Sequence, residues 1–202
     1  MTVTGKIEKT PGLYDSGVLL FFAITVLSSL ACTNHTKGNR GAFPTNSPNL
    51  FYINNVPFFP EDEDRCGPAV LASVFSYFGY NVSPDDISKS IYSESLNGTL
   101  NIDMINYVKQ FTEGKGLTFS EESGDIELIK KEVRDGHPVV VFADLGVWSI
   151  RKGHYMLIVG YDDSREGIIA YSGLKRDKFI SYDRFMRIWE RGGYWTLRVI
   201  SD

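Results

Sequence analysis

Two side chains in this sequence could act together as a nucleophile and a base, namely Cys66 and His154. Cys66 precedes Gly67, Pro68 and an apolar pattern of helical spacing, so it stands at the predicted start of a helix. Unpaired backbone N–H groups and the positive end of the helix dipole meet there, which lowers a thiol pKa from its usual value of about 8.5. The same N–H groups can hold an oxyanion, and Gly67 leaves room for a substrate carbonyl. The alternative is a buried structural cysteine.

A thiolate nucleophile needs a base, and the chain has three histidines. His35 lies in a polar segment rich in Gly, Asn and Thr, and His137 stands in a predicted turn between Gly136 and Pro138. His154 opens a long apolar run, HYMLIVGY, that reads as a buried strand. A polar residue at the mouth of such a strand is placed over the core, so His154 is the candidate general base.

The elements that must position this pair follow from periodicity and capping. Helices are predicted from Cys66, from Ser83 with Asp86 as its capping partner, over the stretch NGTLNIDMINYVKQF and over DIELIKKEVRDG. Strands are predicted for PVVVF, HYMLIVGY, residues 168–171 and YWTLRVI, with a short helix, SYDRFMRIWERG, before the last one. Helices followed by an antiparallel sheet give an α+β fold.

The motifs CGPA, from Cys66, and GHYMLIVGYD, around His154, together resemble the papain-like, bacteriocin-processing (double-glycine leader) peptidases and their stand-alone relatives. The segment VPFF before the cysteine and the closing RGGYW fit the same family, so the resemblance covers the chain from about Val56 to its end. It implies a papain-like fold, Cys66 as the nucleophile, His154 as the general base, and a peptide or protein substrate.

Two positions depart from the family pattern. The family usually places a glutamine five or six residues before the nucleophile, where its amide serves the oxyanion hole, whereas this chain has Pro60 and Glu61 there. The third catalytic residue, usually Asp or Asn, falls by position on Ser172. A serine hydroxyl can fix the imidazole tautomer but carries no charge to stabilise imidazolium, so Glu61 is the oxyanion candidate and Ser172 the orienting candidate. Asp162 and Asp163 are expected to be turn residues only.

The composition limits the function further. The 202 residues carry a net charge of −4 and no basic stripe, which argues against a nucleic-acid partner. The scattered histidines and two cysteines lack the spacing of a metal site, and neither a cofactor nor a nucleotide is expected. The hydrophobic fraction of 43% suits one domain with a real core.

The N-terminal part of the chain is predicted to be an export signal. Lysines precede the uncharged run SGVLLFFAITVLSSLA, and SSLAC resembles a bacterial lipobox in which Cys32 becomes lipidated. This divides the chain into an export signal of the lipoprotein type (1–31), a tether (32–48) and a papain-like peptidase domain (49–202). The alternatives are a membrane-spanning helix, for which the run is short, and a disulfide between Cys32 and Cys66.

Together these features predict a cysteine peptidase held on the membrane of the bacterial cell envelope by a lipid anchor. One alternative is a weakened or inactive papain-like module that binds peptides, which the residues at Glu61 and Ser172 would suit. Another is a peptidoglycan peptide hydrolase, although the Cys–His relatives of that class tend to carry a DCSG-like motif and this chain has CGPA.

Replacement of the candidate lipid-attachment residue tests the anchor. Cys32→Ala is expected to leave an uncleaved precursor that no longer incorporates fatty acid, because the thiol is the acylated group. Metabolic labelling with a palmitate analogue measures this directly. Equal labelling of the wild type and Cys32→Ala would rule out lipidation at Cys32.

Overall fold

The structure is a computed structural model that describes residues 48–61 and 63–201. The predicted export signal, the candidate lipid-attachment residue Cys32 and all but the last residue of the predicted tether lie outside the described residues. Within the described residues no helix is long and apolar enough to cross a membrane.

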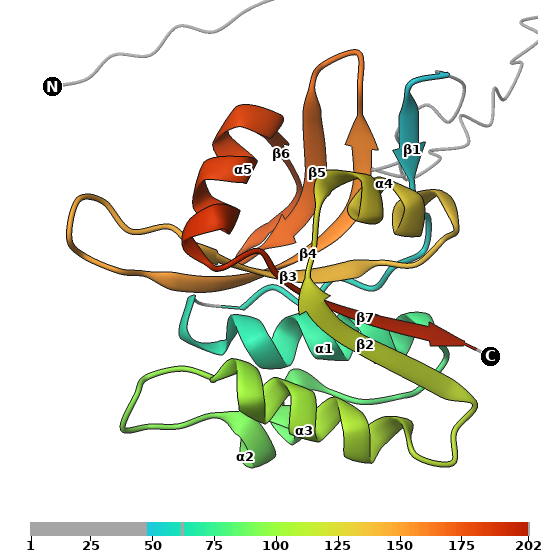
Figure 1. Ribbon diagram of the computed structural model, residues 1–202. Coiled ribbons are helices and arrows are strands. Elements are labelled where there is room, and N and C mark those ends of the chain that lie inside the picture. The colour runs from blue at the N-terminus through green and yellow to red at the C-terminus, as the bar shows by residue number, and fades with distance from the viewer. Residues whose placement is uncertain (1–47, 62, 202) are drawn as a thin grey trace, which may run out of the picture. The chain divides into compact units, whose positions relative to one another are not determined.

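The described part of the chain forms an α+β fold, as the sequence predicted (Figure 1). Helices α1 to α3 precede all strands except β1 along the chain, and the strands form an antiparallel sheet. The strands form one seven-stranded sheet in the order β2-β7-β3-β4-β5-β6, with β1 paired to β4 off this path. Every pair of neighbouring strands in this sheet runs antiparallel. The helices are α1 (Cys66–Tyr77), α2 (Pro84–Ile91), α3 (Asn101–Thr112), α4 (Ile126–Arg134) and α5 (Tyr182–Arg191). The strands are β1 (Leu50–Tyr52), β2 (Leu117–Ser123), β3 (Val139–Asp144), β4 (Gly153–Asp162), β5 (Gly167–Ser172), β6 (Lys175–Ser181) and β7 (Trp195–Ser201).

Helices cover both faces of the sheet. Figure 1 shows α1, α2 and α3 gathered on one side and α4 and α5 on the other. The first ten residues of α1 are all buried, which is typical of a helix enclosed by its neighbours. Beneath it, β3 and β4 are buried almost throughout, as expected of strands covered on both faces. Because α1 packs on β4, the predicted nucleophile and the predicted base come from two adjacent, rigid elements.

The local signals in the sequence account for most of these elements. Ser83 caps α2, accepting a hydrogen bond from the Asp86 N–H at 3.2 Å, and Asp125 caps α4 by accepting one from the Leu128 N–H at 2.8 Å. The apolar stripe of α2, Ile87 and Ile91, is buried as its spacing predicted.

Besides the three-residue β1, two longer strands have no counterpart among the strands predicted from the sequence. β2 lies between α3 and α4, and β6 returns from β5. Both are outer strands of the sheet, and both carry many polar side chains, LTFSEES and KRDKFIS. Their half-exposed position explains the weak signal, because an edge strand does not need the continuous apolar run of β3 or β4.

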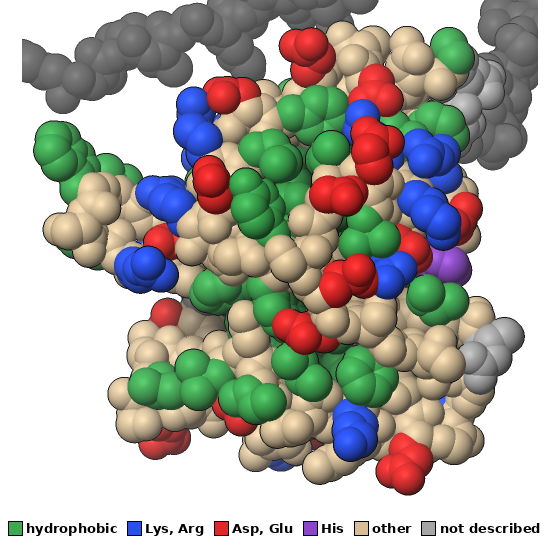
Figure 2. All heavy atoms as spheres, in the orientation of Figure 1, with side chains coloured by type: hydrophobic (Ala, Val, Ile, Leu, Met, Phe, Trp, Pro, Cys, Tyr) green, Lys and Arg blue, Asp and Glu red, His purple; other side chains and the backbone are tan. Residues whose placement is uncertain are grey.

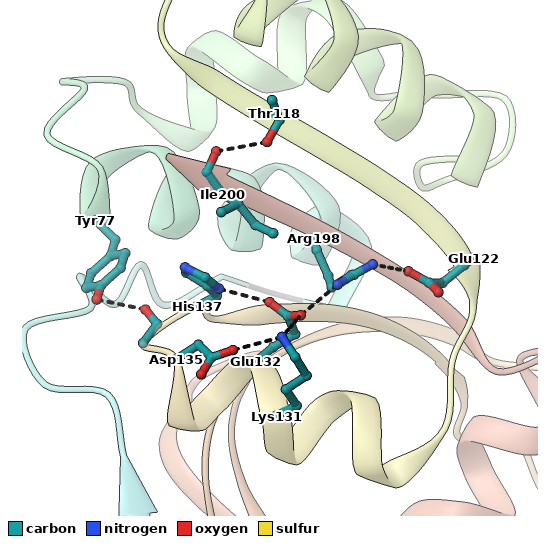
Figure 3. A network of polar contacts seen from close by, with 10 residues as sticks. Tyr77, Thr118, Glu122, Lys131, Glu132, Asp135, His137, Arg198 and Ile200 are labelled. Atoms are coloured by element: carbon teal, nitrogen blue, oxygen red, sulfur yellow. Dashed lines mark hydrogen bonds and ion pairs between the residues drawn. The ribbon is translucent and has the colours of Figure 1, made fainter. Parts of the chain in front are cut away.

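A buried carboxylate ties α4 to the sheet (Figure 3). The Glu132 side chain is 2% exposed and accepts hydrogen bonds from Arg198 of β7 at 2.6 Å and from the His137 ring at 2.9 Å. Arg198 also pairs with Glu122 of β2. Burial alone would raise the pKa of Glu132, but the bonds from His137 and Arg198 outweigh it and lower that pKa. His137 therefore belongs to this structural network, at the turn where the sequence placed it.

Candidate active site

Cys66 is the first residue of α1, and the chain enters the helix through a short 3-10 turn, Glu63–Arg65. Arg65, at the N-cap, makes no side-chain capping hydrogen bond, so no side chain there competes for the first amides of the helix. Cys66 is a free thiol with 6% of its surface exposed, and its Sγ accepts a hydrogen bond from the Tyr155 backbone N–H at 3.3 Å. The thiol therefore lies against β4, beside the residue that follows His154.

Gly67 packs closely against the segment before α3, and the expectation that it also leaves room for a substrate carbonyl stays a prediction. A Cβ built on Gly67 would lie 3.1 Å from the Thr99 Cβ and 3.2 Å from the Met104 Sδ. Glycine at this position therefore lets the mouth of α1 approach the segment that leads into α3.

His154 lies near the start of β4 and is 2% exposed. Its Nε2 is hydrogen-bonded to the Ser172 Oγ at 2.9 Å, and Ser172 is the last residue of β5. The pairing of Leu157 with Tyr171 places Ser172 opposite Met156, so that His154 and Ser172 are diagonal neighbours on one face of the sheet. The register of this hairpin thus brings together the two residues that the sequence analysis paired by position.

Glu61 meets the other three residues in adjoining cavities. A narrow cavity is lined by Glu61, Cys66 and Ser172, and a neighbouring one of about 660 Å³ is lined by Glu61, His154 and Ser172. Gly173 lines both cavities. A Cβ built on it would lie 3.6 Å from the Glu61 carbonyl oxygen and 4.0 Å from the His154 Cε1, so Glu61 and His154 both lie close to this residue. The four site residues named from the sequence within the described chain therefore converge. Their catalytic roles remain predictions.

Burial raises the pKa of the Cys66 thiol to about 11. The backbone N–H groups of Tyr155, Gly67 and Cys66 itself act in the opposite direction, and the nearby charge of Asp64 raises the pKa further. The sequence analysis expected a lowered pKa, and the net direction is the reverse. Donors at the helix mouth are present, but the loss of solvation of a buried thiolate outweighs them. The resting residue is a thiol, so attack on a carbonyl requires a base to take its proton.

Tyr155 was not singled out in the sequence, although it supports the site from two sides. Its N–H faces Cys66, while its hydroxyl donates to the Asn101 Oδ1 at 2.6 Å and to the Thr99 carbonyl at 3.3 Å. The side chain thereby joins β4 to the start of α3. The only signal in the sequence was its position next to His154, where alternation turns its side chain to the opposite face of the strand.

The aspartates of the β4–β5 turn lie apart from the site, as expected. The Asp162 carboxylate accepts hydrogen bonds from the backbone N–H groups of Ser164 and Arg165 and so closes the turn. Asp163 pairs with Lys130 at 2.7 Å.

Comparisons with known proteins found a matching family profile and several similar solved structures. Residues 52–195 match the sequence profile of the Peptidase C39 like family. A protein described as a C39-like peptidase from Bacillus anthracis has a similar structure, with a TM-score of 0.64 and 18% identity over 76% of this chain and 98% of that one. No curated protein sequence matches the chain.

Two further solved structures share the fold. The peptidase domain of Streptococcus ComA, a bifunctional ABC transporter, gives a TM-score of 0.56 and 20% identity over 73% of this chain and 99% of that one. A double-glycine-motif protease from an AMS/PCAT transporter, in complex with a leader peptide, gives a TM-score of 0.57 and 17% identity over 75% of this chain and 95% of that one. At these identities the likeness establishes the fold.

The raised pKa of Cys66 predicts how its alkylation depends on pH. Iodoacetamide should modify native Cys66 slowly at neutral pH, and the rate should rise as the solution approaches pH 11, because only the thiolate reacts. Mass spectrometry of the Cys66 peptide measures this rate. In guanidinium the same residue should titrate near its ordinary value of about 8.5. A native rate that is already at its plateau near neutral pH would show a preformed thiolate and contradict this account.

Proposed function

The chain belongs to the Peptidase C39 like family, and on that premise we propose that it is a cysteine peptidase that hydrolyses peptide bonds in the bacterial cell envelope. The observation that carries the proposal is the convergence of Cys66 with the hydrogen-bonded pair His154–Ser172 around shared cavities. The substrate is a peptide or a protein. This choice is supported by the related AMS/PCAT protease, whose structure contains a leader peptide.

In the proposed mechanism His154 removes the proton that the buried Cys66 thiol retains at rest. In the tautomer that this mechanism uses, the proton is on Nε2, which donates to the Ser172 Oγ, and Nδ1 is the basic nitrogen. The proton passes from Sγ to Nδ1 as sulfur attacks the scissile carbonyl carbon, and it then passes to the departing amine as the C–N bond breaks. Water hydrolyses the resulting thioester and releases the second product. Ser172 orients the ring in this scheme and contributes no charge.

The oxyanion of the tetrahedral intermediate needs donors near Cys66. The backbone N–H of Cys66, at the mouth of α1, is one candidate. Glu61 lines the same narrow cavity, where the family places an amide. An ionised carboxylate repels a developing oxyanion, so the native residue would slow the chemical step if it occupied that position.

The location in the envelope is the second part of the proposal. It rests on the lipobox-like SSLAC string that ends at Cys32 and on the polar segment that follows it. The acyl chains on Cys32 would hold the peptidase domain at the surface of a membrane.

A peptide-binding module without catalytic power is a second candidate. Three observations favour it: Glu61 replaces an amide, Ser172 replaces a charged or amide partner of the histidine, and burial holds Cys66 as a thiol. Such a module would bind peptides in the same cavities without cleaving them.

Glu61→Gln separates these candidates. If Glu61 occupies the oxyanion position, the substitution restores a donor and removes a repulsive charge, and kcat/KM for a general peptide substrate should rise about 100-fold, the size of effect found when one oxyanion donor is lost. Asp64→Asn is the matched control, since it removes a neighbouring charge that also lines the cavities without supplying a donor to that position. Its effect should be far smaller.

The remaining outcomes of this experiment are also informative. Cys66→Ala should abolish turnover. Equal increases in kcat/KM for Glu61→Gln and Asp64→Asn would show that Glu61 acts only through its negative charge and does not occupy the oxyanion position. Absence of turnover in every variant and in the wild type, with peptide binding retained, would establish the binding module instead.

A further inference from the structure

The loop between β3 and β4 holds an apolar tip in solvent. Val147, Trp148 and Ile150 are 64%, 98% and 75% exposed, while the strands on either side are buried. Figure 2 shows hydrophobic side chains at the far end of this loop, standing clear of the body of the domain. Large apolar side chains that gather on a protruding loop usually mark a site that contacts a membrane or another molecule.

The tip is held in place by a network at its base. The buried Asp144 carboxylate accepts hydrogen bonds from the backbone N–H groups of Gly146 at 2.9 Å and Lys152 at 2.8 Å. From α5, Arg191 donates to the carbonyl oxygens of Gly146 and Asp144. These contacts clamp both arms of the loop, so the exposure of its tip is built into the fold.

The turn at the tip is also specified. The Ile150 N–H donates to the Val147 carbonyl at 3.2 Å, and Trp148 adopts a positive φ of 60°. A Cβ on Gly146 would lie 1.8 Å from the Ile150 carbonyl oxygen, so only glycine allows the loop to close this tightly. A left-handed backbone at a large non-glycine residue is unfavourable, and here it presents the indole outward.

The chemistry of the tip fits a lipid bilayer better than a peptide. Trp148 combines an apolar body with an N–H donor, which suits the boundary between headgroups and acyl chains. Arg151 and Lys152 follow directly, and residues 145–152 contain no acidic side chain, although the whole chain is acidic. This pattern matches the negative surface of a membrane that contains anionic lipids.

The tip also stands apart from the substrate cavities. Its neighbours Leu145 and Lys152 line the cavities beside His154 and Cys66 respectively, but none of Val147, Trp148 and Ile150 lines either one. The two ends of the loop therefore lie at the candidate site, while its apolar tip lies outside the cavities.

We propose that the Val147–Ile150 tip inserts into the interface of an anionic bilayer and so sets the orientation of the peptidase domain on the membrane. This rests on the envelope location proposed above. A lipid chain on Cys32 would hold the domain near the membrane, and the tip would be a second contact point, placed next to the site. Stable attachment to membranes usually requires two such signals.

Trp148 itself reports on insertion, because the other two tryptophans, Trp189 and Trp195, are buried. The full chain is mixed with excess vesicles of two kinds, phosphatidylcholine alone and phosphatidylcholine with phosphatidylglycerol, each prepared with and without bromine on the acyl chains. Brominated lipid should quench the Trp148 emission, and the same vesicles should protect it from aqueous acrylamide. Trp148→Phe supplies the background from the buried tryptophans.

Three variants test the cause of the quenching. The double variant Val147→Ser/Ile150→Ser keeps the reporter and should lose most of the quenching. Arg151→Gln should lower the ratio of inserted to free tip about fivefold, the effect of one cation near an anionic membrane, and only on vesicles containing phosphatidylglycerol. The control Ile102→Ser, at another exposed apolar residue, which lies in α3, should change nothing.

The proposal is overturned if Trp148 stays open to acrylamide and insensitive to brominated lipid on both kinds of vesicle. If Trp148 becomes protected from acrylamide as the protein concentration rises without vesicles, the tip mediates self-association. If the protection requires added peptide, the tip binds the substrate. Peptidase activity is read separately, so a failure of the proposed catalysis would leave these readouts unchanged.

Discussion

The packing of the first turn of α1 against β4 is the constraint on which the site depends. Through it the Cys66 Sγ receives the Tyr155 N–H at 3.3 Å and lies beside the strand that carries His154. Both elements are almost wholly buried, so the side chains of the proposed nucleophile and base are positioned by the core and not by mobile loops. The hairpin of β4 and β5 then adds Ser172 on the same face, and Glu61 joins from the segment before α1.

The same burial that positions the proposed nucleophile, Cys66, also disfavours its thiolate form. Desolvation raises the thiol pKa to about 11 despite three backbone donors, and the partner of His154 is a neutral hydroxyl. A carboxylate in place of Ser172 would stabilise imidazolium and favour an ion pair with Cys66. The Cys66 thiol therefore keeps its proton at rest, and negative charge develops on sulfur only as that proton leaves. A substrate that displaces water strengthens the interaction of this charge with the N–H donors at the start of α1.

The positions of several site residues could be predicted from the sequence, whereas the outer strands and the environment of Cys66 could not. Pro68 and the apolar spacing marked the start of α1. Counting along the β4–β5 hairpin selected Ser172, which lies diagonally across from His154, because strand geometry is local and regular. The polar outer strands β2 and β6 gave little signal. The direction of the Cys66 pKa was wrong, because desolvation depends on residues brought together only by the fold. For the same reason neither the packing role of Gly67 nor the buried charge network of Glu132 could be predicted.

Trapping with a peptidyl fluoromethyl ketone tests most directly whether Cys66 attacks with His154 as its base. Intact-mass analysis of the native chain should show one covalent peptide adduct, mapped to Cys66 and absent in Cys66→Ala. His154→Ala should slow its formation by about 100-fold or more, the usual contribution of a general base. The Cys66 thiol should meanwhile remain slow toward iodoacetamide at neutral pH, because substrate-like binding supplies the alignment that iodoacetamide lacks. A native chain that forms no adduct, or one whose adduct forms equally fast without His154, would contradict the account.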